Sequence, residues 1–187
     1  EPNADVCKQY GDTANVKSFL MACKVFRNSQ GKTTPMYRTH AGQRYYFNDI
    51  SIDIVFSQEI FQVEKSYGKV FNDTSTWMML NIEGQKVLMP GDADAQTQAS
   101  VVSIYSKEYL TVDILQAFHH GYNVYTAVSD RFSFKTVIYP FFTSEFDNWR
   151  AEIKEGNQLV RETATEYFSH EDGTKVLTFP YVIGSVQ

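Results

Sequence analysis

A change in hydrophobic period near Pro90 limits the folds open to this chain more than any other feature of the sequence. From residue 36 to residue 90, apolar and polar residues alternate, which is typical of strands with one buried face. Ile50, Ile52, Ile54 and Phe56, for example, share one face of a single strand. Turn signals at 41–42, 48–49 and 83–84 divide this region into an antiparallel meander with predicted strands at 36–40, 43–47, 49–57, 76–82 and 85–90.

Helices and strands are predicted to alternate after Pro90. The strand at 113–119 is mostly apolar, which suits burial on both faces. Glu171-Asp172-Gly173 is a strong hairpin signal between two final strands, at 165–170 and 175–181. The other predicted elements are helices at 93–106, 124–132 and 144–163, a strand at 136–141, and an N-terminal amphipathic helix that starts at Thr13, ends near residue 28 and packs on an apolar surface. Because no repeat or linker interrupts the chain, we expect a single domain, 1–187, of the mixed α/β (α+β layered) class, with helices packed on a mixed or antiparallel sheet.

Composition excludes several classes of protein. With 43% hydrophobic and 15% aromatic residues among 187, the chain has enough apolar material for a core and is not intrinsically disordered. A net charge of −5 argues against a broad basic surface for nucleic acid, and no apolar run approaches the roughly 20 residues of a membrane span. Cys7 and Cys23 are expected to be thiols, with a disulfide between them left open.

Two short stretches contain residues that could bind a metal. In 87–94 an apolar strand runs into Pro90-Gly91 and then presents Asp92 and Asp94. A carboxylate at the end of a strand can be held toward a cleft as a metal ligand, although an aspartate in this position often only caps the next helix. In 113–123 the adjacent His119 and His120 follow a strand directly, and imidazole is the commonest neutral metal ligand.

The two stretches support each other. A strand followed by an aspartate, then a helix, then a strand followed by histidines could place both ligand types at one edge of a sheet. Adjacent histidines on extended backbone point to opposite faces, so only one is expected to reach a given metal. Asp113, at the start of the same strand, is expected to be structural, and His40 and His170 to be surface or packing residues. No GxGxxG, GxxxxGK[ST] or GxSxG motif occurs.

At these residues the sequence resembles the metallo-β-lactamase-fold hydrolases. The resemblance lies in Asn72-Asp73-Thr74-Ser75, Leu88-Met89-Pro90-Gly91-Asp92 and Leu115-Gln116-Ala117-Phe118-His119-His120-Gly121, which have the order and spacing of that family over residues 40–183. It is strongest to the branch of competence-type DNA-uptake proteins and related bacterial hydrolases. The resemblance implies an αββα sandwich with a metal cluster, usually of two zinc ions, at one edge of its sheets. It also implies that Asp92 bridges the metals, that His119 is the late ligand, and that His120 and Asn72 lie on the substrate side.

The chain departs from the family in one respect. The His-x-His-x-Asp-His motif, which supplies most ligands in the first half of such a fold, does not occur in this sequence. The chain therefore looks like the C-terminal half of such a domain, and we expect it alone to bind zinc weakly and to have little or no activity. The expected partners are the missing N-terminal half and a second copy bound through the exposed sheet face. Nucleic acid stays open as a partner without support from the charge, as does the compartment, cytoplasmic or extracellular.

Two classes of function on this fold remain open, beside a stand-alone α/β binding domain that matches the family only by chance. In the first, the full-length protein is a metal-dependent hydrolase that acts on a phosphodiester or another ester through metal-activated water. In the second, the same fold has lost its metal site and serves as a binding or scaffolding module. The presence of Asp92 and His119-His120-Gly121 favours the first.

Overall fold

The computed structural model describes residues 8, 11, 13–33, 35, 37–57, 72, 75–122, 130–142, 144–145 and 151–186. The chain divides into two compact units: residues 1–39 with 60–68, and residues 40–59 with 69–187. In the first unit, α2 (Thr13–Val25) begins at the predicted residue, and none of its residues is buried. Cys7 and most of the predicted helix at 124–132 lie outside the described residues.

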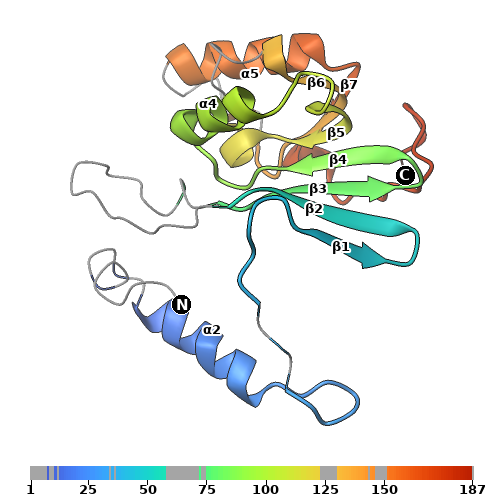
Figure 1. Ribbon diagram of the computed structural model, residues 1–187. Coiled ribbons are helices and arrows are strands. Elements are labelled where there is room, and N and C mark those ends of the chain that lie inside the picture. Colours follow the sequence, from blue (N-terminus) through green and yellow to red (C-terminus); the bar gives the residue numbers. More distant parts are fainter. Residues whose placement is uncertain are drawn as a thin grey trace. The chain divides into compact units, whose positions relative to one another are not determined.

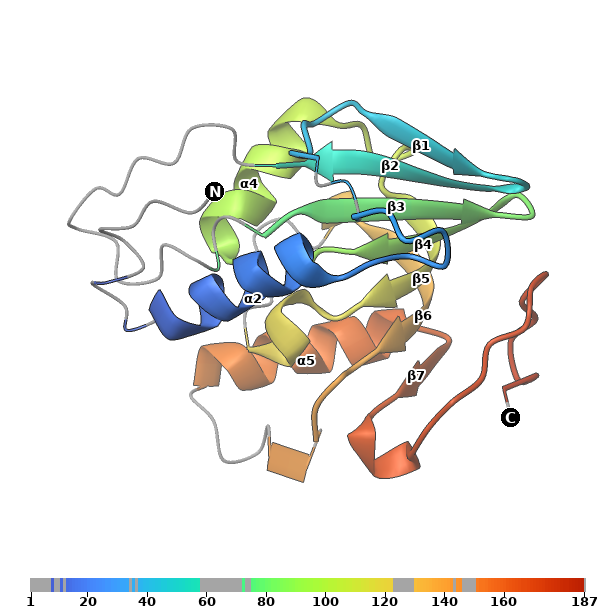
Figure 2. The ribbon, with the colours of Figure 1, turned by 90° about the horizontal axis from the view of Figure 1, so that it is seen from below.

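The second unit is built on one sheet. Its described strands follow one another in chain order across seven positions, which Figures 1 and 2 show from two directions. The strands are β1 (Arg44–Phe47), β2 (Ile50–Phe56), β3 (Trp77–Ile82), β4 (Gln85–Met89), β5 (Thr111–Gln116), β6 (Ser133–Ile138) and β7 (Glu166–Phe168). Strands β1 to β4 pair antiparallel, and β4 to β7 pair parallel. The predicted mixed α/β layered class is confirmed.

The α-helices that the structure describes in this unit lie on one face of the sheet (Figure 1). They are α4 (Ala95–Ile104), which connects β4 to β5, and α5 (Ala151–Thr163), which precedes β7. Parallel strands are joined by right-handed crossovers. Because β4 to β7 follow one another in the same direction across the sheet, their crossover helices lie on the same face. The core lies between these helices and the sheet, and it includes Trp77, Met79, Leu88, Leu115 and Val137 from the strands and Val101, Val102 and Val160 from the helices.

Polar contacts hold other parts of this unit against the sheet. The guanidinium group of Arg44 on β1 binds the carboxylate of Asp53 on β2, its cross-strand neighbour. The side-chain amide of Gln85 on β4 donates to the carbonyl oxygen of Tyr181 at 2.8 Å, and the Tyr181 hydroxyl lies 3.0 Å from that of Thr136 on β6. The segment that contains Tyr181 is therefore attached to the sheet without adding a strand to it. None of the described helices has the length and hydrophobicity that a bilayer-spanning segment needs.

Two predicted strands are wrong. Residues 37–40 form no strand, because the main chain turns at 41–42 and β1 pairs with β2 instead. The predicted final hairpin also does not form. β7 pairs parallel with β6, and residues 170–172 form a 3-10 turn, η4 (His170–Asp172), in which the Ser169 side chain and the Asp172 carboxylate cap each other's backbone N–H groups. Residues 174–178 are described and form no strand.

Candidate functional site

The candidate site forms where β4 and β5 end. These strands are parallel neighbours, with Val87 opposite Ile114 and Leu88 opposite Leu115, so the segments that follow them leave the sheet at the same edge. The backbone N–H of His119 donates to the carbonyl oxygen of Gly91 at 2.9 Å. This bond joins the turn that carries Asp92 to the turn that carries the histidines.

Gly91 allows the first turn to lie close to Ser75. Its φ is +62°, a conformation that other residues rarely adopt, and a Cβ atom at this position would lie 3.2 Å from the Cβ atom of Ser75. The Ser75 hydroxyl oxygen accepts a hydrogen bond from the backbone N–H of Asp92 at 3.2 Å. The position of Asp92 is therefore set by the close approach of Gly91 to Ser75 and by the hydrogen bond from Asp92 to the same residue.

The two aspartates of this turn have different roles. Asp94 is the N-cap of α4, and its carboxylate accepts the backbone N–H groups of Gln96 at 2.9 Å and Thr97 at 3.2 Å. Asp92 caps no helix, and its Oδ1 lies 3.0 Å from Nε2 of His120. The capping alternative that the sequence left open thus applies to Asp94, while Asp92 faces an imidazole.

The structure separates the two histidines. His120 pairs with Asp92, whereas Nε2 of His119 lies 3.5 Å from Nδ2 of Asn72. The ring of His119 also lies 5.5 Å from that of Tyr122. The resemblance implied His119 as the metal ligand beside Asp92, with His120 and Asn72 on the substrate side. In the structure the residue next to Asp92 is His120, and His119 is the one beside Asn72.

The backbone of both histidines is strained. β5 ends at Gln116, and His119 and His120 have φ values of +47° and +57° within the short turn η1 (Phe118–Gly121). The expectation for extended backbone therefore does not apply to this pair. A residue other than glycine costs roughly 1–2 kcal/mol in the left-handed region, and such strain is concentrated at functional sites.

Asn157, on the neighbouring helix α5, holds the end of this turn. It is fully buried, and its Nδ2 donates to the carbonyl oxygens of Gly121 at 2.5 Å and Ile153 at 2.9 Å. The sequence analysis did not identify this residue. The available signal was a polar amide three positions before Val160, within the stripe of the predicted helix that turns inward.

The donor chemistry fits part of a metal centre. The Nδ1 atom of His120 is buried and has no hydrogen-bond partner among the described residues, although the rest of the side chain is accessible. Carboxylate oxygen and imidazole nitrogen are both zinc ligands, and a structural or catalytic zinc site needs at least three from the protein. Within the described ranges, no three His, Cys, Asp or Glu side chains converge in this way. The residues present could supply two ligands but do not complete a centre.

Asp113 lies near the amino end of β5 and has a structural role. Its carboxylate accepts hydrogen bonds from Lys135 Nζ at 2.7 Å and from the backbone N–H of Lys86 at 2.9 Å. Burial opposes its ionisation, but these two bonds and the nearby ammonium charges outweigh that effect and lower the pKa of Asp113 below its ordinary value.

No model of a known protein family matches the sequence, and a search among curated proteins finds no match. The fold and the site together define a mixed α/β layered domain with a carboxylate–imidazole pair at the carboxyl ends of its central parallel strands.

Proposed function

We propose that this chain is the second half of a metallo-β-lactamase-like hydrolase domain, in which Asp92 and His120 contribute ligands to a zinc centre. The observation that carries the proposal is the 3.0 Å contact between Asp92 and His120, two residues that come from the ends of separate strands. Neighbouring parallel strands bring their carboxyl ends to one edge, where ligands bind in open α/β sheets. The strained backbone of His120 and the burial of Asn157 against the same turn add support.

The residues of this chain would each have a defined task. Asp92 would provide a negatively charged oxygen ligand, and His120 would provide a nitrogen ligand. The hydrogen bonds from His119 to Gly91 and from Asn157 to Gly121 would hold the turns that carry these two side chains. His119 and Asn72 would lie on the substrate side and donate hydrogen bonds to it. When bound, zinc in such a centre lowers the pKa of a water molecule and stabilises charge on the substrate oxygen. The substrate would be a phosphodiester or another ester, as the resemblance to hydrolases suggests.

The missing ligands would come from a first half with the His-x-His-x-Asp-His motif. This sequence does not contain that motif, and its four histidines are His40, His119, His120 and His170. We therefore expect the chain to bind zinc weakly by itself and to gain hydrolase activity only when such a half is supplied. The genomic sequence upstream of the codon for Glu1 tests this point directly, because it should encode the motif.

Zinc titration by calorimetry tests the site. The chain should bind zinc with an affinity weaker than micromolar, and Asp92→Asn or His120→Gln should each weaken binding by roughly tenfold or more. His40→Gln is the matched control, because it removes an imidazole remote from Asp92 in sequence and should leave the affinity unchanged. Zinc binding that is insensitive to Asp92→Asn and His120→Gln would contradict the proposal, and a metal-free binding module would then be favoured. Submicromolar affinity for two ions would show that the chain needs no second half.

A further inference from the structure

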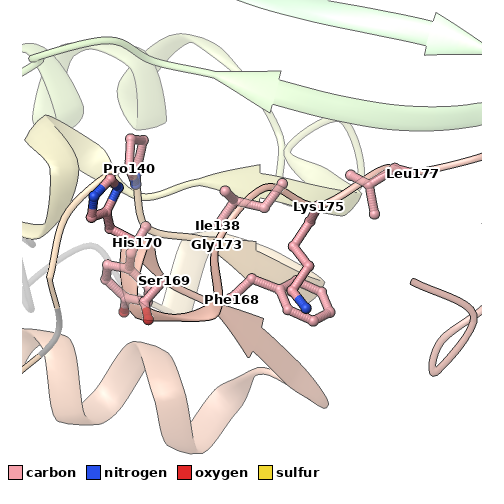
Figure 3. A pocket seen from close by; sticks show the side chains of 9 residues that line it. Ile138, Pro140, Phe168, Ser169, His170, Gly173, Lys175 and Leu177 are labelled. Atoms are coloured by element: carbon pink, nitrogen blue, oxygen red, sulfur yellow. The ribbon is translucent and has the colours of Figure 1, made fainter. Parts of the chain in front are cut away.

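A cavity lies at the carboxyl ends of β6 and β7 (Figure 3). It has a volume of about 200 Å³ and is formed by the residues that follow the two strands together with the segment after η4. Ligand sites usually measure about 300–1,000 Å³, so this cavity suits a molecule of roughly one ring. It is separate from the Asp92–His120 pair, since neither residue lines it.

The walls of this cavity are largely apolar. Ile138, Pro140, Phe168 and Leu177 line it, and Figure 3 shows their side chains around the same space. Apolar walls with a small number of polar groups are the usual composition of a small-molecule site. The occupant should therefore present a flat, apolar body to these residues.

The polar groups around the cavity leave a positive charge available. Nζ of Lys175 lies 5.8 Å from the centre of the Phe168 ring, and no carboxylate among the described residues forms an ion pair with it. The two acidic residues of η4 are engaged elsewhere. Asp172 accepts the backbone N–H and the hydroxyl of Ser169 at 2.7 and 3.1 Å, and Glu171 accepts the backbone N–H of Ser144 at 2.8 Å. An anionic group on the ligand would therefore meet a cation without competition from these carboxylates.

A row of aromatic rings connects this cavity to the candidate site. The ring of His170, which lines the cavity, lies 4.3 Å from that of Phe142, which in turn lies 6.0 Å from Phe141. Phe141 is 5.3 Å from Tyr122, whose ring lies 5.5 Å from His119. The cavity and the histidine pair therefore lie along one continuous aromatic rim of the sheet.

We propose that this cavity binds a small planar molecule with a single carboxylate, which Lys175 neutralises while the ring packs between Ile138, Phe168 and Leu177. Charge complementarity selects the anion, and the apolar walls select the ring. This proposal does not depend on zinc binding, because it uses none of the residues at the candidate metal site.

Titration with benzoate, followed by the chemical shifts of the protein in NMR spectra, tests the inference. Benzoate should bind in a saturable manner with a Kd of about 1 mM, as expected for a ligand of this size. The shifts should be concentrated at Phe168, His170 and Lys175. Benzamide, which has the same shape without the charge, should bind at least about fivefold more weakly.

Variants separate a specific site from general attraction of an anion. Lys175→Gln should weaken benzoate binding by about fivefold or more and leave benzamide unaffected. Lys86→Gln is the matched control, because Lys86 also lies over an aromatic ring, that of Tyr109 at 5.5 Å, but outside this cavity. Equal binding of benzoate and benzamide, an unchanged affinity in Lys175→Gln, or no saturation at tens of millimolar would overturn the inference. Unchanged chemical shifts at the core residues of the variants would show that they remain folded.

Discussion

The two ends of β5 carry acid–base pairs of opposite character. Near the amino end, Asp113 has two hydrogen-bond donors, and its side chain is only 17% exposed. Beyond the carboxyl end, Asp92 and His120 are in contact, but their side chains are 41% and 37% exposed and one ring nitrogen has no partner among the described residues. Asp113 and its partner Lys135 have satisfied hydrogen bonds, and both lie on regular strand backbone. The second pair is incomplete and is built on a strained turn.

The difference between the two pairs is the one expected between residues that stabilise a fold and residues that bind a ligand. A carboxylate with satisfied hydrogen bonds near the start of a strand stabilises the sheet and has little capacity left for a ligand. An imidazole with an unpaired nitrogen, held in a left-handed conformation, costs the folded state free energy, and such costs are concentrated at functional sites. Asn157 offsets part of that cost by satisfying the carbonyl group of Gly121.

The largest effect is expected when the support of the strained end is removed. Asn157→Ala should lower the free energy of unfolding by about 2–3 kcal/mol, because it leaves the buried carbonyl oxygen of Gly121 without its donor and opens a small cavity. Urea denaturation monitored by circular dichroism measures this change. Gln158→Ala, at the exposed neighbouring position, is the control and should have an effect within about 0.5 kcal/mol. Similar losses of stability in both variants would contradict the inference that Asn157 supports the turn at Gly121.

A smaller effect is expected at the satisfied end, and it should depend on pH. The folded state lowers the pKa of Asp113 below its ordinary value of 3.8, so its contribution is present above that pH and is lost as the pH falls through the lower, folded-state pKa. Asp113→Asn should therefore cost about 1–2 kcal/mol near pH 7 and progressively less in acid. Denaturation midpoints between pH 2 and pH 7 provide the test.

Asp49→Asn provides the reference for that series. Asp49 is exposed in the turn between β1 and β2, so its replacement should change the stability by no more than about 0.5 kcal/mol. If the cost of Asp113→Asn were constant with pH, the hydrogen bonds to the carboxylate would not be the source of its stabilisation.

The smallest expected effect is a gain in stability. His120→Gly should raise the free energy of unfolding by about 0.5–1 kcal/mol, because glycine adopts a φ of +57° without strain. It should at the same time weaken zinc binding, as expected when a strained site is relaxed. Glu83→Gly is the matched control, since Glu83 has a φ of +50° in the turn between β3 and β4 and should gain a similar amount with no change in zinc affinity. A loss of stability in His120→Gly would mean that the contact with Asp92 outweighs the strain.

Local patterns were sufficient for much of this fold. The alternation in 43–57 and 76–90 predicted β1 to β4, and the pairs at 48–49 and 83–84 predicted the turns in which Asn48 and Glu83 have positive φ. Asp94 followed by a helix was also readable, because an N-cap depends on bonds to residues two and three positions away. The wrong prediction of a hairpin at 165–181 has a non-local cause. The residues around Gly173 have hairpin chemistry, but β7 pairs with β6, a strand about 30 residues earlier in the chain.

The sequence by itself determined that an aspartate and two histidines follow successive strands of the chain, because strand period and turn residues are local properties. Only the tertiary structure decided that His120 rather than His119 faces Asp92, that Asn157 supports their turn, and that His170 lines a cavity with Lys175. These contacts join residues that lie 28, 36 and, for the cavity as a whole, up to 39 positions apart in the sequence. They depend on backbone dihedral angles and on the packing of α5 and β7, which no pattern of neighbouring residues specifies.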